Sequence, residues 1–119
     1  MEVVVTSASV IGFSYRISMI ERSLFTGLIR LHLLHHAAEG PIFGQEMIDE
    51  LGRHGYRLSA GTLYPILHGM ERHGLLQSRS TQHNGRVRRM YRATPAGRKT
   101  LVVARKRVQE LFGEMFERK

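Results

Sequence analysis

Apolar residues recur at helical spacing in three consecutive segments. The first predicts a helix over residues 22–38, closed by Gly40-Pro41, with an apolar stripe of Leu24, Phe25, Leu28, Ile29 and Leu33. The second predicts a helix from about Gly44 to Arg53, ended by Gly55, with Met47, Ile48 and Leu51 inside. The third follows Ser59, a good N-cap, and ends at Gly74, with a stripe of Leu63, Ile66, Leu67 and Met70.

Pro65 complicates the start of the third helix. A helix that begins at Ala60 loses one backbone hydrogen bond at Pro65 and is kinked in its first turns, so a start nearer Thr62 is expected. In either case, the side chains outside the apolar stripe are predicted to face outward, namely Thr62, Tyr64, Pro65, His68 and Arg72.

After Gly74 the pattern changes to a period of two, and Asn84-Gly85 is a strong hairpin signal. The return strand is predicted over residues 86–93, with Arg86 and Arg88 on one face and Val87, Arg89, Tyr91 and Ala93 on the other. Thr94 as N-cap and Pro95 as first helical residue begin a last helix that runs to about Arg118.

The elements follow the order α-α-α-β-β-α, a mainly helical α+β fold with a small hairpin. The short connection between the second and third helices is typical of a helix-turn-helix, and the hairpin beside it is typical of a wing. We therefore expect a winged helix-turn-helix domain over residues 21–93 and a C-terminal dimerisation helix over 94–119. Residues 1–20 have no helical period, and their valines favour extended structure. We interpret them as an arm outside the domain, either a free tail or packed on a partner subunit.

The whole chain has a net charge of +8. Its positive charge is concentrated in the second half of the chain. Residues 1–58 hold five Arg and six acidic residues, whereas residues 59–119 hold thirteen Lys or Arg and four acidic residues. No acidic residue lies between Glu71 and Glu110. Such asymmetry is typical of a polyanion binder, with a solvated basic surface or contact with an anionic membrane as the alternatives.

Several classes of protein are excluded or disfavoured by composition. The 119 residues suffice for one domain, and the absence of Cys excludes disulfides, zinc fingers and a thiol nucleophile. No apolar run approaches the ~20 residues of a membrane span, and the N-terminus lacks the pattern of a secretory signal. We expect a cytoplasmic protein. No catalytic or glycine-rich nucleotide motif is present, so neither an enzyme activity nor a cofactor is expected.

The predicted helix-turn-helix indicates which residues would contact double-stranded DNA. The second helix of such a pair enters the major groove by its N-terminal end, and that end also favours phosphate. The candidates on the two helices are Gln45, Ser59, Gly61, Thr62, Tyr64, Pro65 and His68. The wing adds Arg86, Arg88 and Arg89 as phosphate contacts. Tyr64 would otherwise pack against the wing, Arg89 would lie along the inner surface of the hairpin, and Gln45 would be an ordinary surface residue.

Residues 58–76, LSAGTLYPILHGMERHGLL, resemble the signature of the PadR-type transcriptional regulators. Flanking segments agree with this resemblance, GLIRLHLLHHAAEGPIFGQEMIDEL before it and RRMYRATPAGRKTL after it, so that it spans residues 24–116. The resemblance implies a homodimeric, DNA-binding bacterial repressor of the short type with a single C-terminal helix. Gln45 stands where the family often has Tyr, and the chain has no Trp, which members that bind flat aromatic drugs use at the dimer interface. The arm is also longer than usual, and a small-molecule or metal effector is left open.

The last helix carries more apolar residues than one small domain can bury. Leu101, Val108 and Met115 are seven apart, and Ala104 and Leu111 fall between them, as in a short a/d seam. A second stripe of Val102, Phe112 and Phe116 widens this face. An exposed patch of this size is avoided by soluble monomers. We therefore expect a two-fold dimer with a palindromic operator, in which the last helix packs against the partner's last or first helix, with Leu24 and Leu28 included.

His32, His35 and His36 lie at i, i+3 and i+4 on the first helix, a spacing that can hold a metal. Glu39 is the one carboxylate beside them and no Cys is present, so the pattern favours solvated or interfacial imidazoles, and no metal site is assigned. His68, His73 and His83 form a weaker candidate group. Two alternatives to an ordinary repressor remain open, a winged-helix protein-interaction module and a metal-responsive member of the same family.

Overall fold

The computed structural model describes residues 4–6, 14–16 and 19–117. Within these ranges the helices are α1 (Met19–Glu39), α2 (Gly44–Arg53), α3 (Ala60–Arg72) and α4 (Pro95–Phe112), with a π-helical turn, η1 (Gly113–Glu117), after α4. The strands are β1 (Val4–Thr6), β2 (Ser14–Arg16), β3 (Ile42–Phe43), β4 (Tyr56–Arg57), β5 (Leu76–His83) and β6 (Arg86–Ala93). The predicted fold class, mainly helical with a small antiparallel hairpin, is confirmed.

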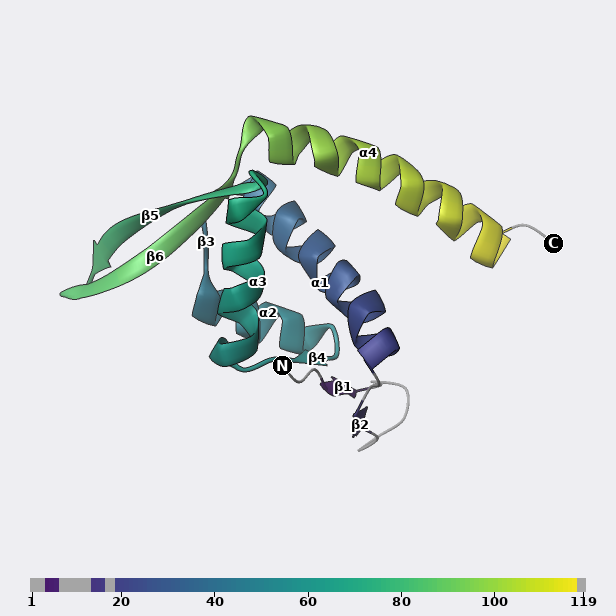
Figure 1. Cartoon of the computed structure of the whole chain (residues 1–119), viewed down its shortest axis with the longest axis horizontal. Helices are drawn as coiled ribbons and strands as arrows, with labels where there is room; N and C mark the ends of the chain where they lie inside the picture. Colours follow the sequence, from purple (N-terminus) through teal and green to yellow (C-terminus); the bar gives the residue numbers. More distant parts are fainter. Residues whose placement is uncertain (1–3, 7–13, 17–18, 118–119) are drawn as a thin grey trace.

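The hydrophobic core lies between the first three helices and the root of the hairpin. Its completely or almost completely buried large side chains are Ile29, Leu33, Leu51, Leu63, Leu67, Leu76 and Tyr91. The predicted stripes of the three helices meet there, except that Leu24 and Leu28 of α1 stay exposed. Figure 1 shows that the β5–β6 hairpin projects to one side of this core, while the C-terminal half of α4 extends away on the other side.

The start of α3 differs from the prediction. The helix begins at Ala60 and not nearer Thr62, with Pro65 inside it. The side chain of Ser59 accepts a hydrogen bond from the backbone N–H of Thr62, at 3.2 Å. Because this cap satisfies one of the free N–H groups of the first turn, it stabilises the early start against the hydrogen bond that Pro65 removes. The bounds predicted for α2 and for the return strand of the hairpin agree with the structure.

Short strands that the pattern did not predict connect the helices to the hairpin and the N-terminus. β3 pairs with β6 through Ile42↔Tyr91 and Phe43↔Met90. β1 pairs with both β2 and β4 of the same chain, so the described part of residues 1–20 joins the domain's own β4. Val3, Val10 and Ile11, which also favoured extended structure, lie outside the described residues. A strand of two or three residues is too short to show a periodicity, which explains why the sequence did not reveal these pairings.

The hairpin turn has the conformation that its sequence predicts. Asn84 and Gly85 both adopt positive φ angles, 51° and 77°, as a two-residue type I′ turn requires. The strands are in register from Leu76↔Ala93 at the root to His83↔Arg86 at the tip. Alternation along β6 places Arg86, Arg88 and Arg92 on one face of the wing and Arg89 on the other.

The start of α4 is packed tightly against the turn between α3 and β5. The side chain of Thr94 accepts a hydrogen bond from the N–H of Gly97 at 2.9 Å, and the backbone N–H of Thr94 donates to the carbonyl of Leu75 at 3.0 Å. A Cβ at Gly97 would overlap that same carbonyl of Leu75. Further along α4, Arg98 donates a hydrogen bond to the carbonyl of Ala38 at the end of α1, at 2.9 Å. These contacts fix the direction in which α4 leaves the domain.

None of the helices within the described ranges has the length and apolar character needed to cross a membrane.

The contact at Gly97 leads to a stability prediction. We expect Gly97→Ala to lower the free energy of unfolding by about 1–3 kcal/mol, because the added methyl group forces the backbone of Leu75 to move. Gly27→Ala is the matched control, since Gly27 lies in α1 and a Cβ added there would have no atom within 4 Å of it. We expect that change to raise stability by up to about 1 kcal/mol through helix propensity. Urea denaturation followed by circular dichroism measures both, and equal stabilities of the two variants would contradict the packing argument.

Candidate nucleic-acid interface

The N-terminal end of α3 presents small residues and polar backbone to solvent. Ser59 and Gly61 are exposed, and the nearest atom to a Cβ built at Gly61 is the capping oxygen of Ser59, at 3.6 Å. A polyanion can therefore approach this backbone closely, at the positive end of the helix. Thr62 departs from the expected outward orientation. It is only 4% exposed, and its hydroxyl lies 3.3 Å from that of Ser59.

Tyr64 connects α3 to the N-terminus of α2. Its side chain is half-buried, and a Cβ on Gly44 would overlap the phenol ring. Tyr64 therefore packs against α2 where the absence of a side chain at Gly44 leaves room, rather than lying entirely outside the core. The ring of His68 lies 6.2 Å from that of Tyr64, one turn further along α3. Gly44 was not singled out in the sequence, because only the fold brings it against Tyr64.

Three further candidates are exposed on the same side of the helix pair. Gln45 stands in the first turn of α2, and Pro65 and His68 follow on α3. The side-chain amide of Gln45 donates to Asp49 at 3.3 Å, an exposed contact within α2. Ser59, Gly61 and Tyr64, at the N-terminal half of α3, complete the set of candidates on the two helices. We call this set the reading surface.

The root of the wing is tied to α3 by Glu71. The carboxylate of Glu71 accepts hydrogen bonds from the backbone N–H of Ser78 at 2.9 Å and from its hydroxyl at 2.8 Å. Arg89 donates to the hydroxyl oxygen of Ser78 at 2.9 Å from the opposite strand. Arg89 thus lies along the inner surface of the hairpin. This is the position that the sequence left open as the alternative to a phosphate contact. Hydrogen bonds to an ionised carboxylate are stronger than neutral ones, so this contact orients the wing relative to α3.

Arg88 contacts the helical domain instead of standing free. Its guanidinium carbon lies 3.9 Å from the centroid of the Phe43 ring, and one of its nitrogens lies 3.4 Å from the carboxylate of Glu46. An arginine over an aromatic face and beside a carboxylate is stabilised where it is. Arg86, in contrast, is exposed next to the turn, paired in register with His83. Arg86 is therefore a predicted phosphate contact that the structure leaves exposed at the tip of the wing.

Tyr91 anchors β6 in the core. Tyr91 is paired with Ile42 of β3 on one side and with Ser78 of β5 on the other. Its side chain is completely buried, and burial raises the pKa of its phenol. Its phenol oxygen makes no hydrogen bond within the described residues. The sequence placed Tyr91 on one face of a strand, but its burial depends on β3, which the sequence did not reveal.

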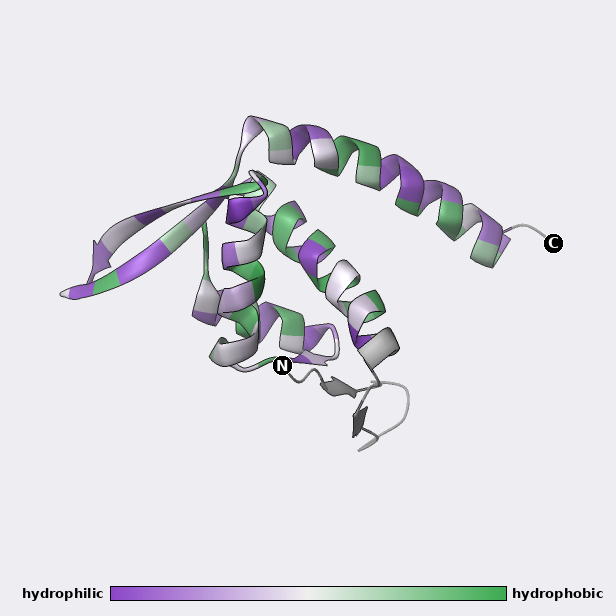
Figure 2. Cartoon of the chain, viewed as in Figure 1, coloured by the Kyte–Doolittle hydropathy of each residue, from purple (hydrophilic) through white to green (hydrophobic). Residues whose placement is uncertain are grey.

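The apolar face predicted for the last helix is largely exposed. Val108, Leu111, Phe112, Met115 and Phe116 are all about half exposed or more, with Phe116 at 69%. Leu101 is an exception, since it is 5% exposed and belongs to the intrachain core, and Ala104 is half-buried. Leu101 packs inward because the N-terminal part of α4 lies on α1, so its side chain is not free to join a seam. Figure 2 shows apolar segments continuing along α4 beyond the rest of the domain.

A groove of about 620 Å³ runs between α1 and α4. Apolar side chains make up most of its lining, with a few polar ones beside them: Leu28, Leu31, His32, His35, Leu101, Arg105, Val108, Gln109 and Phe112. Leu28 of α1 and Val108 and Phe112 of α4, which are all exposed, therefore face a shared concave surface, which we call the α1–α4 groove.

The histidines of the first helix and those near α3 are arranged differently. Within the described part of the chain, His68, His73 and His83 belong to no group of three metal-binding side chains, whereas His35 and His36 do, together with Glu39. His73 instead contacts the carbonyl of Gly69 at 2.7 Å.

The comparisons with known proteins agree on one family. The model of the transcriptional regulator PadR-like family matches residues 33–103. The chain is 53% identical over 87 residues to transcriptional regulator Rv3488 of Mycobacterium tuberculosis, a match that covers 73% of this chain and 81% of the relative.

Solved structures with the same fold include several regulators. A protein from Streptococcus mutans UA159 has a TM-score of 0.69 at 27% identity, over 74% of this chain and 82% of that one. A PadR family transcriptional regulator from Eggerthella lenta has a TM-score of 0.67 at 27% identity, over 84% and 91%. PadR of Bacillus subtilis, in complex with operator DNA, has a TM-score of 0.55 at 19% identity, over 63% of this chain and 45% of that one. The family match spans more than half of the chain, so this protein belongs to the PadR-like family of transcriptional regulators.

Proposed function

We propose that this regulator binds double-stranded operator DNA, with α3 in the major groove and the β5–β6 wing on the phosphate backbone. The observation that carries the proposal is the reading surface, which leaves Gly61 exposed at the positive end of α3, His68 exposed further along that helix and Gln45 exposed at the start of α2. The exposed Arg86 extends positive charge from there along the wing. The structure of Bacillus subtilis PadR with operator DNA supports the proposal, since the same fold holds DNA in that protein.

The proposal assigns different tasks to the three wing arginines. Arg86 contacts phosphate, because its side chain is exposed at the tip of the hairpin. Arg88 holds the wing to α2 through Phe43 and Glu46, and Arg89 holds the two strands together at Ser78. A phosphate contact contributes affinity without sequence preference, whereas base contacts in the groove select the operator.

We further propose a homodimer in which α4 of each chain covers the other's exposed apolar face. Leu111, Phe112, Met115 and Phe116 stand in solvent in the single chain, and Leu24 adds to them from α1. Large exposed apolar surfaces of this kind are buried in stable assemblies. Two-fold symmetry would set two recognition helices about 34 Å apart on one face of DNA, which matches a palindromic operator. Repression follows where such a dimer covers a promoter.

The first functional prediction concerns base recognition by α3. We expect His68→Ala to weaken operator binding by about 1–3 kcal/mol, the range for one lost base contact, while affinity for random duplex changes little. His73→Ala is the matched control, because this exposed histidine lies just past the C-terminal end of α3 and outside the set of residues that forms the reading surface. Fluorescence anisotropy at constant salt, with the DNA upstream of the protein's own gene, measures both variants. Equal operator affinities of the wild type and His68→Ala would remove His68 from the interface.

The second prediction separates Arg86 from Arg88. We expect Arg86→Ala to weaken operator and random duplex alike, and to reduce the slope of log affinity against log salt by about one. Arg88→Ala should change this slope less, because its guanidinium already lies beside the carboxylate of Glu46. Salt titrations of both variants decide the point. A larger slope change for Arg88→Ala would mean that Arg88 leaves Glu46 to contact phosphate. No measurable affinity of the wild type for any duplex would favour the protein-interaction alternative.

The third prediction tests the dimer. We expect Leu111→Glu combined with Met115→Glu to shift the protein from dimer to monomer in sedimentation velocity, since burying two carboxylates against apolar residues is costly. Operator binding should be lost at low protein concentration. Val103→Glu is the control, since Val103 is 55% exposed but lies on the opposite side of α4 from Leu101. A wild type that sediments as a 13.6 kDa monomer at micromolar concentration and still binds a palindrome would contradict the dimer.

A further inference from the structure

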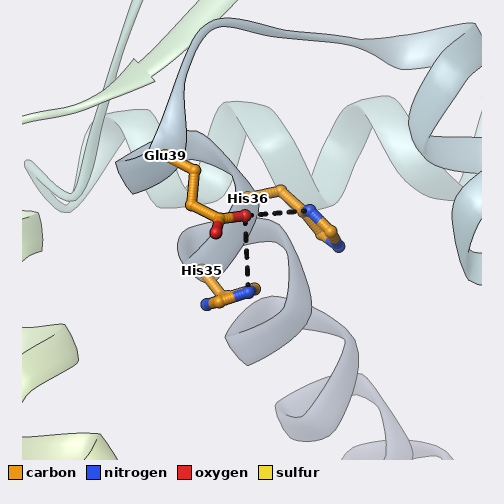
Figure 3. A group of neighbouring side chains, drawn as sticks. All are labelled: His35, His36 and Glu39. Carbon is orange, nitrogen blue, oxygen red and sulfur yellow. Dashed lines mark ion pairs between the residues drawn. The ribbon is translucent and has the colours of Figure 1, made fainter.

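Three metal-binding side chains converge at the C-terminal end of α1. Figure 3 shows that the imidazoles of His35 and His36 both point toward the carboxylate of Glu39. Nε2 of His35 lies 3.5 Å from Oε1 of Glu39, and Nδ1 of His36 lies 3.8 Å from the same oxygen. One donor atom from each of the three residues lies within 4.8 Å of the others. The three residues are half-buried or exposed, so an ion can reach them from solvent.

The separations between these donor atoms suit a common ion. Zinc binds imidazole nitrogen and carboxylate oxygen at about 2.0–2.2 Å with tetrahedral geometry, which places neighbouring ligand atoms about 3.4 Å apart. The two nitrogen–oxygen distances in this cluster are close to that value. Two imidazoles and one carboxylate are also a frequent set for ions of this class, with one position left for water. Little side-chain movement is needed to bring all three donors onto one ion.

The second nitrogen of His36 faces a carboxylate, as the second nitrogen of a metal-bound imidazole commonly does. Its Nε2 lies 3.6 Å from Oε1 of Glu50, a residue of α2. A histidine that binds a metal through one nitrogen carries its proton on the other and commonly donates it to a carboxylate, which orients the ring. His36 therefore has a metal-facing nitrogen directed at Glu39 and a proton-carrying nitrogen directed at Glu50. This arrangement reaches across two helices, which the spacing within α1 alone does not reveal.

The second nitrogen of His35 has a different neighbour, and this neighbour is incompatible with a bound ion. Nδ1 of His35 lies 3.4 Å from a guanidinium nitrogen of Arg105 on α4. Arginine only donates hydrogen bonds, so in this contact Nδ1 is the acceptor and the proton is on Nε2, toward Glu39. An ion at Nε2 takes the lone pair of that nitrogen, and the single ring proton then belongs on Nδ1. Both Nδ1 and Arg105 would then be donors, and the contact between them is lost.

We propose that His35, His36 and Glu39 bind one divalent transition-metal ion of the zinc type, and that the bound ion releases Arg105 from His35. Arg105 lines the α1–α4 groove, so occupation of the site changes a contact between α1 and α4. The ion replaces the proton of His35 Nε2, which moves through solvent to Nδ1, and no oxidant or reductant is involved. The site lies apart from the reading surface and the wing, and its test requires no DNA.

Titration calorimetry of the purified chain with zinc chloride tests the site, with cobalt(II) absorption as a spectroscopic readout. We expect one ion per chain and a visible cobalt spectrum of tetrahedral intensity. Glu39→Gln and His36→Ala should each weaken zinc binding at least about 10-fold, since even residues that only support ligands contribute 10–100-fold. Glu39 is largely exposed, so Glu39→Gln should leave the fold intact by circular dichroism. His83→Ala, on the exposed wing tip, should bind zinc as the wild type does.

Arg105→Gln tests the second half of the proposal. Removing the guanidinium removes both a competing donor and a positive charge beside the ion, so this variant should bind zinc more tightly than the wild type. Wild-type zinc affinity in Glu39→Gln and His36→Ala would overturn the site. Unchanged or weaker zinc binding by Arg105→Gln would show that the bound ion and the contact between Arg105 and His35 do not exclude each other.

Discussion

The orientation of the wing depends on the carboxylate of Glu71. This residue is the last acidic side chain before a long basic stretch, and it accepts hydrogen bonds from both the backbone and the hydroxyl of Ser78 at the root of β5. Since Glu71 belongs to the same helix as the exposed His68, the wing and the reading surface form one unit. The buried ring of Tyr91 and the pairing of β3 with β6 hold the other strand of the wing in the core. With these contacts in place, the tip bearing Arg86 projects in a defined direction from α3.

The helix pair depends on a second constraint, the absence of a side chain at Gly44. Tyr64 occupies the space that a Cβ would fill, so α2 and α3 approach each other closely at their N-terminal ends. The approach places Gln45 beside the first turns of α3. A larger residue at position 44 would displace the ring of Tyr64 and thereby alter the reading surface without changing any of its exposed members. In the proposed complex this close contact determines how both helix ends meet DNA.

The α4 helix lines the α1–α4 groove and, through Arg105, also contacts a histidine of α1. Its first turns are fixed by the Thr94 cap, by Gly97 against Leu75 and by Arg98 on the last turn of α1. Beyond Leu101 its apolar residues are exposed, and Arg105 reaches back to His35. The proposed dimer surface and the proposed metal site are therefore both adjacent to the polar contact between His35 of α1 and Arg105 of α4. A change at His35 would act on the helix that carries the dimer surface.

Local signals in the sequence determined the elements, whereas the burial of single side chains was decided by the tertiary structure. The Asn84-Gly85 turn, the caps at Ser59 and Thr94 and the bounds of α2 depend on residues a few positions apart, so they could be predicted. The burial of Thr62, the burial of Leu101 and the position of Arg88 beside Glu46 could not, because each depends on neighbouring side chains that periodicity does not encode. The same holds for β3, which is a strand only because β6 lies beside it. Hydrophobic spacing specifies which face of a helix is apolar, but the packing of the other elements determines how much of that face is covered.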